Sequence, residues 1–268
     1  MHLDILYQDD ALVVINKPSG LLVHRSDIDR HETRFALQLV RNQIGEHVYP
    51  VHRLDKPTSG VLAFARRSEY ASAIVEQWRQ RAVAKRYLAI VRGYMPEFTH
   101  LDKPMAPPVD KYAKHERIKP EQSAITDFIS LAQVELPVAI DKYPQSRYSL
   151  IEAIPHTGRK HQIRRHLKHL SHPIIGDARY GKGRHSRYFR DQLNAPRLLL
   201  HAWQLSLEHP ITQESLTFTA PLDQVWQERI QDFGWADALP DALRASLAAE
   251  PHPSLQSFYP QHEVDSDE

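Results

Sequence analysis

Short runs of apolar residues alternate with turn-forming residues along the first half of the chain. Runs of this length, bounded by Gly, Pro or Ser, are typical of β-strands. They predict strands at residues 5–7, 12–15, 21–24, 61–65 and 87–91. In residues 34–44 and 69–81 the apolar positions instead recur three and four apart, which predicts two amphipathic helices.

The second half repeats this mixture of patterns. Strand patterns lie at residues 124–134, 148–154, 198–205 and 215–219, and helical patterns at residues 160–169 and 223–233. We therefore predict an α+β fold built on one large, mixed and mostly antiparallel sheet that is flanked by helices and loops.

Two segments depart from these patterns. Residues 104–120 are rich in proline and charge, which predicts an exposed insertion at about residues 102–120. Beyond Pro240 the periodicity is lost, and acidic residues and prolines predict a mobile tail over residues 240–268. The expected organisation is one domain over residues 1–235, followed by this tail.

Composition excludes several classes of protein. The 268 residues contain no cysteine, which rules out disulfides, thiolate metal sites and cysteine nucleophiles. No apolar run approaches the roughly 20 residues that a membrane helix needs, and the N-terminus lacks a signal-peptide pattern. We expect a soluble, cytoplasmic protein that does not associate with a membrane.

The net charge of +1 conceals a strong segregation of charge. Residues 156–190 are dense in Lys, Arg and His, and Asp177 is their only carboxylate. Such a stretch is usually a solvated face, but cations packed this closely repel one another unless a polyanion is present. The segment therefore favours a nucleic-acid surface.

One short motif carries candidate chemistry. Residues 52–60 read HRLDKPTSG and stand immediately before the apolar run VLAFA. They place the Asp55 carboxylate between Arg53 and Lys56 on a loop stiffened by Pro57 and a Thr-Ser-Gly turn. Spacing alone leaves two interpretations open: a catalytic carboxylate, or an aspartate that caps a turn or pairs with Arg53 at the surface.

The motif HRLDKPTSG resembles the active-site motif of the RluA-type pseudouridine synthases, His-Arg-Leu-Asp followed by two variable residues and Thr-Ser-Gly. Four other segments resemble further motifs of that family in the expected order. They are DDALVVINKPSGLLVH with its turn at residues 16–20, KRYLAIVRG at residues 85–93, GRKHQIRRHLKHLSHPIIGDARYG at residues 158–181, and LLLHAWQLSLEHP at residues 198–210. The resemblance covers most of residues 1–235.

The resemblance implies a pseudouridine synthase fold with an active-site cleft across the sheet, and it assigns roles to individual residues. Asp55 corresponds to the essential aspartate, and Arg164 to the arginine that pairs with it and would hold it charged. Tyr87 corresponds to the tyrosine that stacks on the target base and can accept a proton late in the reaction. Arg53 corresponds to the arginine that enters the RNA stack, and Leu200 to an apolar residue beside the base.

The remaining RNA contacts are expected from the catalytic domain itself. Many relatives carry an N-terminal S4-type RNA-binding domain, whereas this sequence begins with the catalytic strands. The further substrate-binding candidates are therefore His52, Arg159, His161, Arg165 and Lys168.

The resemblance also implies partners and cofactors. The product is an isomer of the substrate, so neither a cofactor nor a metal is expected, and the sequence has no glycine-rich nucleotide-binding motif. The resemblance is strongest to members that modify tRNA at uridine 65, so tRNA is the favoured partner; ribosomal RNA is the alternative. We expect a monomer that requires no protein partner.

Ser171 departs from the family pattern. It stands where relatives usually carry Gly, and glycine reaches a positive φ without strain. We expect the backbone to adjust locally at this position without loss of activity.

Three rival interpretations remain. His161, His166, His169 and His172 could form a metal site, although such a site would need a carboxylate and only Asp177 is near in sequence. The chain could be a non-catalytic RNA-binding module, but Asp55, Tyr87 and Arg164 are all retained. A base-excising glycosidase would also flip a nucleotide and use one carboxylate, but it would leave an abasic sugar.

Overall fold

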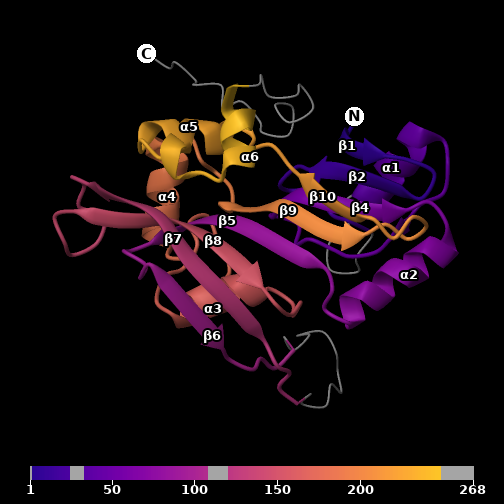
Figure 1. Cartoon of the computed structure of the whole chain (residues 1–268). Coiled ribbons are helices and arrows are strands. Elements are labelled where there is room, and N and C mark those ends of the chain that lie inside the picture. Colours follow the sequence, from indigo (N-terminus) through magenta and orange to yellow (C-terminus); the bar gives the residue numbers. More distant parts are fainter. Residues whose placement is uncertain (1, 25–32, 108–119, 249–268) are drawn as a thin grey trace.

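The computed structural model describes residues 2–24, 33–107 and 120–248 (Figure 1). Its strands form one 10-stranded sheet in the order β1-β2-β4-β9-β5-β8-β7-β6, in which β10 pairs with β9 and β3 with β4. Every pairing is antiparallel except that of β4 with β9, which is parallel. The predicted α+β fold with a mostly antiparallel sheet is confirmed.

The strands alternate with helices along the chain. The strands are β1 (Asp4–Gln8), β2 (Leu12–Lys17), β3 (Tyr49–Pro50), β4 (Ser59–Ala65), β5 (Ala84–Arg92), β6 (Phe98–Asp102), β7 (Ile125–Leu136), β8 (Ser146–Pro155), β9 (Leu200–Glu208) and β10 (Ser215–Thr219). The α-helices are α1 (Ala36–Ile44), α2 (Ser68–Arg79), α3 (Gln162–His169), α4 (Gly183–Gln192), α5 (Gln224–Asp232) and α6 (Asp241–Arg244), and two short 3₁₀ turns, Ala236–Ala238 and Ala245–Ala248, flank α6.

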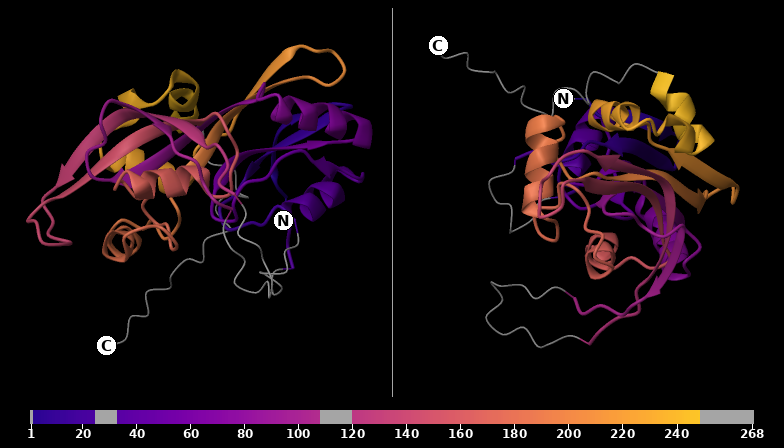
Figure 2. Two further views of the ribbon diagram at one scale, coloured as in Figure 1. Left: turned by 90° about the horizontal axis from the view of Figure 1, so that it is seen from below. Right: turned by 90° about the vertical axis from the view of Figure 1, so that its left-hand side faces the viewer.

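The sheet has two halves that meet at a weak seam. Figure 2 shows the first half, with β1, β2, β4, α1 and α2, beside the second, with β5 to β8 and helices α3 and α4. At the seam β4 and β9 pair through only two residue pairs, Ser59 with His201 and Gly60 with Ala202. Strands that part after two pairs leave room between them, and the candidate motif, residues 52–60, enters the sheet at this point.

Gly60 makes the close approach at this seam possible. Its φ is +114°, and a Cβ built there would lie 2.1 Å from the carbonyl oxygen of Ala202. No side chain fits at that distance. The final Gly of HRLDKPTSG is therefore required by the path of the backbone between β4 and β9.

The structure corrects several predicted elements. Residues 21–24 form no strand, because Leu21 and Val23 are buried against α1 while the segment makes only an isolated bridge between Leu22 and Phe35. Strands β3 and β6 and helix α4 were not predicted. β6 (FTHLD) is a polar edge strand, and α4 buries only His185 and Phe189, so neither has a clear apolar pattern.

Packed structure also continues beyond the boundary predicted at residue 235. Leu239, in the extended link after the first 3₁₀ turn, and Leu243 of α6 are both buried in the core that β5, β8 and α5 share. The predicted tail therefore begins no earlier than the end of α6. Residues 249–268, and residues 108–119 of the proposed insertion, lie outside the described residues; the ends of that insertion are joined by a bridge between Met105 and Gln122.

Ser171 takes the conformation that glycine usually supplies. Its φ is +66°, in the left-handed region. The expectation of a local backbone adjustment is therefore wrong: the serine itself adopts the strained conformation at the end of α3, where its N–H bonds the carbonyl of Lys168.

Among the described residues, no helix is both long and apolar enough to cross a membrane.

Candidate active site

A cavity of about 490 Å³ opens at the seam between the two halves of the sheet. It is lined by residues 51–55 and Thr58, by Trp78 of α2, by Lys85 and Tyr87 of β5, by Pro155 and residues 157–164, and by Leu200 at the start of β9. Its size is within the usual range for small-ligand pockets. The cleft across the sheet that the resemblance implied is therefore present at this seam.

The loop that carries Asp55 is fixed by backbone contacts. The N–H of Thr58 donates to the carbonyl of Asp55 at 3.0 Å, which closes a turn. The neighbouring turn at residues 17–20 holds the next two carbonyls: Lys17 Nζ and the N–H of Gly20 donate to Lys56, and Ser19 Oγ donates to Pro57. Asp55 therefore projects from a loop that two strands hold in place.

Arg164 of α3 joins this loop to a second carboxylate. Its Nη1 donates to Asp55 Oδ2 at 2.9 Å, while Nε and Nη2 donate to Asp177 at 2.8 and 2.9 Å. This parallel pair of bonds to Asp177 fixes the plane of the guanidinium and therefore the position of its remaining donor. The Arg164 side chain is 7% exposed and that of Asp177 1%, whereas that of Asp55 is 20% exposed.

These contacts explain the electrostatics of the pair. Burial disfavours a charged guanidinium, but the hydrogen bonds and charges of Asp177 and Asp55 outweigh this effect, so the pKa of Arg164 is raised. Burial alone would raise the pKa of Asp177, but the Arg164 contacts and the N–H groups of Tyr180 and Arg179 lower it overall. Arg164 is thus a permanent cation beside Asp55.

Tyr87 and Leu200 face the same cavity from adjacent strands. The register of β5 against β9 shifts between Arg86 and Tyr87, and a bulge of this kind re-aims side chains beside functional sites. Burial, and to a smaller extent the charge of Asp55, raises the pKa of the Tyr87 phenol. The phenol is therefore protonated at neutral pH.

The other predicted site residues divide into two groups. Arg53, His52, Arg159 and His161 line the cavity with Asp55, Tyr87, Arg164 and Leu200. Arg165 and Lys168 do not line it: Arg165 Nη1 donates to the carbonyl of Ala106, and Lys168 is exposed with its amine 5.8 Å from the centre of the Tyr180 ring.

Two of the lining histidines are neutral at physiological pH. His161 Nε2 lies 3.8 Å from Asp55 Oδ1 and its Nδ1 lies 3.0 Å from the hydroxyl of Tyr180. Burial lowers the pKa of His161 to about 4, although the charge of Asp55 opposes this shift. Burial, aided by the charge of Lys85, lowers the pKa of His52 to about 3, and its Nε2 accepts a bond from the N–H of Ala63.

The sequence interpretation missed Asp177 and Tyr180 as parts of this site. Asp177 Oδ1 accepts the N–H groups of Arg179 and Tyr180, each at 2.9 Å, and so shapes the loop that carries the tyrosine. The Tyr180 ring lies 5.3 Å from the Arg164 guanidinium. One signal could have found Asp177, because it is the only acid among residues 156–190.

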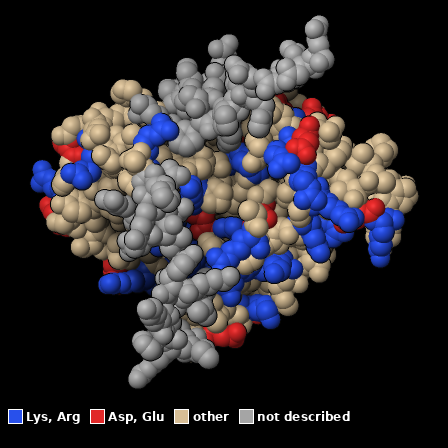
Figure 3. Space-filling model, turned by 180° about the vertical axis from the view of Figure 1, so that it is seen from behind, with Lys and Arg blue, Asp and Glu red and all other residues tan. Residues whose placement is uncertain are grey.

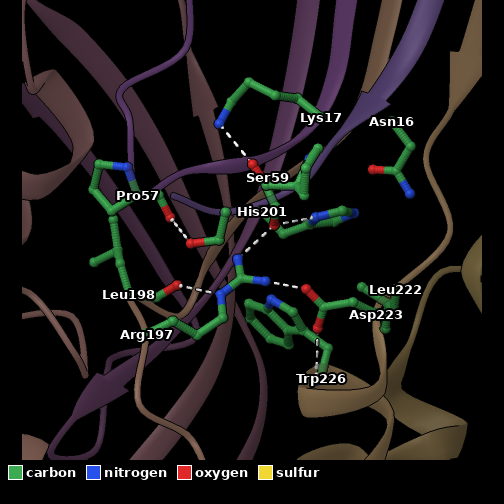
Figure 4. A network of polar contacts seen from close by, with 12 residues as sticks. Asn16, Lys17, Pro57, Ser59, Arg197, Leu198, His201, Leu222, Asp223 and Trp226 are labelled. Carbon is green, nitrogen blue, oxygen red and sulfur yellow. Dashed lines mark hydrogen bonds and ion pairs between the residues drawn. The ribbon is translucent and has the colours of Figure 1, made fainter. Parts of the chain in front are cut away.

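A second buried network lies behind the motif (Figure 4). Arg197 bonds Asp223 through Nη1 and Ser59 Oγ through Nη2, and Ser59 lies 2.8 Å from His201 Nδ1. His201 Nε2 donates to the carbonyl of Ala220, so Nδ1 is left to accept the serine proton. Arg197, Asp223, Ser59 and His201 are thus all hydrogen-bonded, and they anchor the end of the motif to β9 and α5.

The histidines of the basic segment make contacts of their own. His166 lies 2.9 Å from Thr126 Oγ1 and 3.2 Å from the carbonyl of Lys103, and His172 lies 2.9 Å from the carbonyl of Arg92. Within residues 2–24, 33–107 and 120–248, no three His, Asp or Glu side chains are grouped to hold a metal ion.

Basic side chains gather on the face that carries α3 and α4. Both helices lie on the same side of the sheet (Figure 2), and Figure 3 shows a band of Lys and Arg across that side of the molecule with few acidic residues within it. The exposed cations of this segment are Lys160, Lys168, Arg179, Lys182, Arg184, Arg187 and Arg190. Such a band is the electrostatic footprint of a nucleic-acid-binding surface.

Comparison with known proteins agrees with this geometry. The sequence profile of the RNA pseudouridylate synthase family matches residues 11–169, which include the motif, Tyr87 and Arg164. The chain belongs to this family of RNA-modifying enzymes.

The alignments with individual relatives extend over almost the whole length of those relatives. The chain is 52% identical over 237 residues to the tRNA pseudouridine synthase C of Pasteurella multocida, covering 88% of this chain and 98% of the relative. It is 50% identical over 239 residues, with the same coverage, to the enzyme of that name from Vibrio cholerae. Among solved structures, human RNA pseudouridylate synthase domain containing 4 matches with a TM-score of 0.64 and 28% identity, covering 86% of this chain and 93% of that one.

Proposed function

We propose that this enzyme converts one uridine of tRNA, at position 65, to pseudouridine, with Asp55 as the reacting carboxylate. The observation that carries the proposal is the placement of Asp55 at the wall of a nucleotide-sized cavity, bonded to Arg164 at 2.9 Å and sharing that cavity with Tyr87. The tRNA substrate is inferred from the relatives named tRNA pseudouridine synthase C, which are about half identical to this chain.

The reaction exchanges one bond for another. The N1–C1′ bond of uridine breaks, the base turns, C5 bonds to C1′, the proton on C5 leaves, and N1 gains a proton. Asp55 can begin this sequence by attacking C6 of the base, by attacking C1′, or by removing a ribose proton to form a glycal. Each route needs an uncapped carboxylate oxygen, and Arg164 contacts only Oδ2 of Asp55.

Tyr87 is assigned to the base rather than to the bond exchange. Its ring shares the cavity with Leu200, so a flipped uracil between them would meet one aromatic and one apolar side chain. A phenol with a raised pKa is a poor base at neutral pH. We therefore expect Tyr87 to act first as a stacking surface.

The target nucleotide must leave its helix to reach Asp55. Arg53 is exposed at the cavity, and we assign it the role of filling the space that the uridine vacates in the RNA helix. The band of exposed cations around α3 and α4 supplies contacts to phosphates, which fix the register of the RNA but do not read its sequence. We expect a cytoplasmic monomer that needs no protein partner, no cofactor and no metal.

The test is a map of pseudouridine in total RNA from a strain that lacks the gene, read by carbodiimide labelling and primer extension. The proposal expects loss of one modified site, uridine 65 of tRNA, and its return when the wild-type gene is supplied. Loss of a ribosomal site alone would favour the ribosomal alternative and refute the tRNA assignment. An unchanged map would refute the function itself.

A further inference from the structure

Lys85 lies in the wall of the active-site cavity and is not used by the chemistry described above. It stands two residues before Tyr87 on β5, and both side chains line the cavity. Its amine lies 5.2 Å from the centre of the Trp78 ring and donates to the carbonyl of Thr157 at 3.3 Å. Trp78 is itself stacked on His52, with ring centres 5.0 Å apart. The amine is therefore held in one place by α2, β5 and the segment after β8.

Other buried cations of this protein have stronger partners. Arg164 bonds two carboxylates, and Arg197 bonds the carboxylate of Asp223. The amine of Lys17 donates to three backbone carbonyls at 2.9, 2.9 and 3.2 Å. Within the part of the chain that the structure describes, Lys85 has one long bond to a carbonyl and no carboxylate at ion-pair distance.

This arrangement costs stability unless an anion completes it. Burial lowers the pKa of Lys85 to about 8, which means that the folded protein disfavours the charged amine. Near neutral pH the amine is still mostly protonated. A half-buried cation with unused N–H donors that faces a cavity is a site that an anion would occupy with little competition from water.

The identity of the anion follows from the cavity it would enter. A uridine that reaches Asp55 carries a phosphodiester on each side of its ribose, and both are drawn toward the cavity with it. We propose that Lys85, supported by Trp78 and Thr157, binds one of the two phosphates that flank the flipped uridine. This inference rests on the proposed function, and it assigns Lys85 as a substrate-positioning residue.

The position of Lys85 explains why a phosphate contact here would matter for catalysis. The contact is separate from the band of cations on α3 and α4, which holds the RNA outside the cavity. It forms only when the nucleotide has left its helix, so its binding energy favours the flipped state over the stacked state. Energy released at that stage lowers the barrier to reaction rather than strengthening the initial encounter.

The experiment combines one protein change with single-phosphate changes in the RNA. Lys85→Met keeps an unbranched side chain that is one atom shorter and removes its charge. The RNA is a tRNA acceptor and T-arm stem-loop in which each phosphate near the target uridine is replaced, one at a time, by an uncharged methylphosphonate. Single-turnover rates and dissociation constants are measured for every combination, with thermal unfolding as a check on the fold.

Lys142→Met is the matched control. Lys142 also lies over an aromatic ring, 4.9 Å from the centre of Tyr143, but it is exposed in the β7–β8 turn, at the opposite end of β8 from Thr157. Its removal should change neither the rate nor the pattern along the RNA.

The proposal expects Lys85→Met to slow the single-turnover rate about tenfold to a hundredfold, the range for losing one hydrogen bond to a charged group. It expects one flanking methylphosphonate to slow the wild type by a similar factor and to have no further effect on Lys85→Met. Because Lys85 is buried at a cost, Lys85→Met should unfold at the same temperature as the wild type or higher.

Two outcomes would overturn the inference. One is a single-turnover rate for Lys85→Met within twofold of the wild-type rate. The other is a slow Lys85→Met variant whose rate each methylphosphonate reduces by the same factor as in the wild type, which would make Lys85 a structural residue only. Both outcomes require a wild type that makes pseudouridine in this RNA. A wild type without activity would instead count against the proposed function, so the two failures are distinguishable.

Discussion

Two buried arginines bond the same motif, residues 52–60, but only one of them borders the cavity. Arg164 pairs with Asp55 and Asp177, and Arg197 pairs with Asp223 and Ser59. In the Arg197 network both charged side chains are at most 7% exposed. In the Arg164 network Asp55 is the exception at 20% exposed, whereas the side chains of Arg164 and Asp177 are at most 7% exposed.

The comparison separates a network that only holds the fold together from one that also presents a carboxylate to the cavity. Both networks satisfy a buried guanidinium with a buried carboxylate, because an unpaired charge in the interior is costly. The Arg197 network ends there, with every group directed at another part of the protein. The Arg164 network adds a second carboxylate that is held by one bond and presented to the cavity, which is what a preorganised reacting group requires.

The largest effect is expected from breaking the sealed network. Arg197→Met removes the cation beside the buried Asp223 carboxylate, and removing one member of a buried ion pair costs about 3–5 kcal/mol of unfolding free energy. Urea denaturation measures this loss. The control, Arg190→Met, removes an exposed arginine paired with Asp191 and should cost less than about 1 kcal/mol. Equal losses in the two variants would show that the Arg197 network does not anchor the motif.

The sealed network should also respond to acid. Burial lowers the pKa of His201 to about 4, below the ordinary value of 6.5, so its unfolded form binds a proton first. Its contribution to stability is complete above about pH 6.5 and is lost as the pH falls toward 4, by on the order of 3 kcal/mol.

His201→Gln should therefore lose less unfolding free energy than the wild type between pH 6.5 and pH 4. Denaturation curves at both pH values test this, and the exposed His2→Gln serves as control. Parallel losses in His201→Gln and the wild type would contradict the account.

A smaller effect is expected at the open network from Asp177→Asn. The amide can still accept the N–H groups of Arg179 and Tyr180 but no longer carries the charge that fixes Arg164. We expect kcat to fall about tenfold to a hundredfold with little change in KM, since the amide has one acceptor oxygen and cannot keep both charge-assisted bonds from Arg164. Steady-state kinetics on tRNA measure both constants, with the exposed Asp191→Asn as control. A change confined to KM would assign Asp177 to RNA binding instead.

Sequence patterns predicted most of the sheet, because its central strands are buried and read as apolar runs. They failed where a buried segment is not paired as a strand, and where a paired strand is not buried. Residues 21–24 look like a strand but fill the core beneath α1, and the edge strand β6 carries polar residues on a solvated edge. Hydrophobic periodicity reports burial, so it cannot identify either case.

Only the site residues that lie within recognisable short motifs could be predicted from the sequence. Asp55, Arg164 and Tyr87 were placed by resemblance, and the structure brings all three to one cavity. The supporting residues were not predicted: Asp177, which holds Arg164, and Arg197 and Asp223, which anchor Ser59, are single residues outside any recognised motif role. Arg197 contacts Ser59, 138 positions earlier, and no local pattern encodes such a contact.

The central claim is that the Asp55 carboxylate performs the chemistry, and Asp55→Asn tests it most directly. The amide keeps the shape of the side chain but removes the charge, and single-turnover conversion of tRNA can be measured alongside tRNA binding, with Asp191→Asn as the matched control. The account predicts that Asp55→Asn folds and binds tRNA with an affinity near that of the wild type, yet forms no pseudouridine. Product formed at a rate near that of the wild type would contradict it.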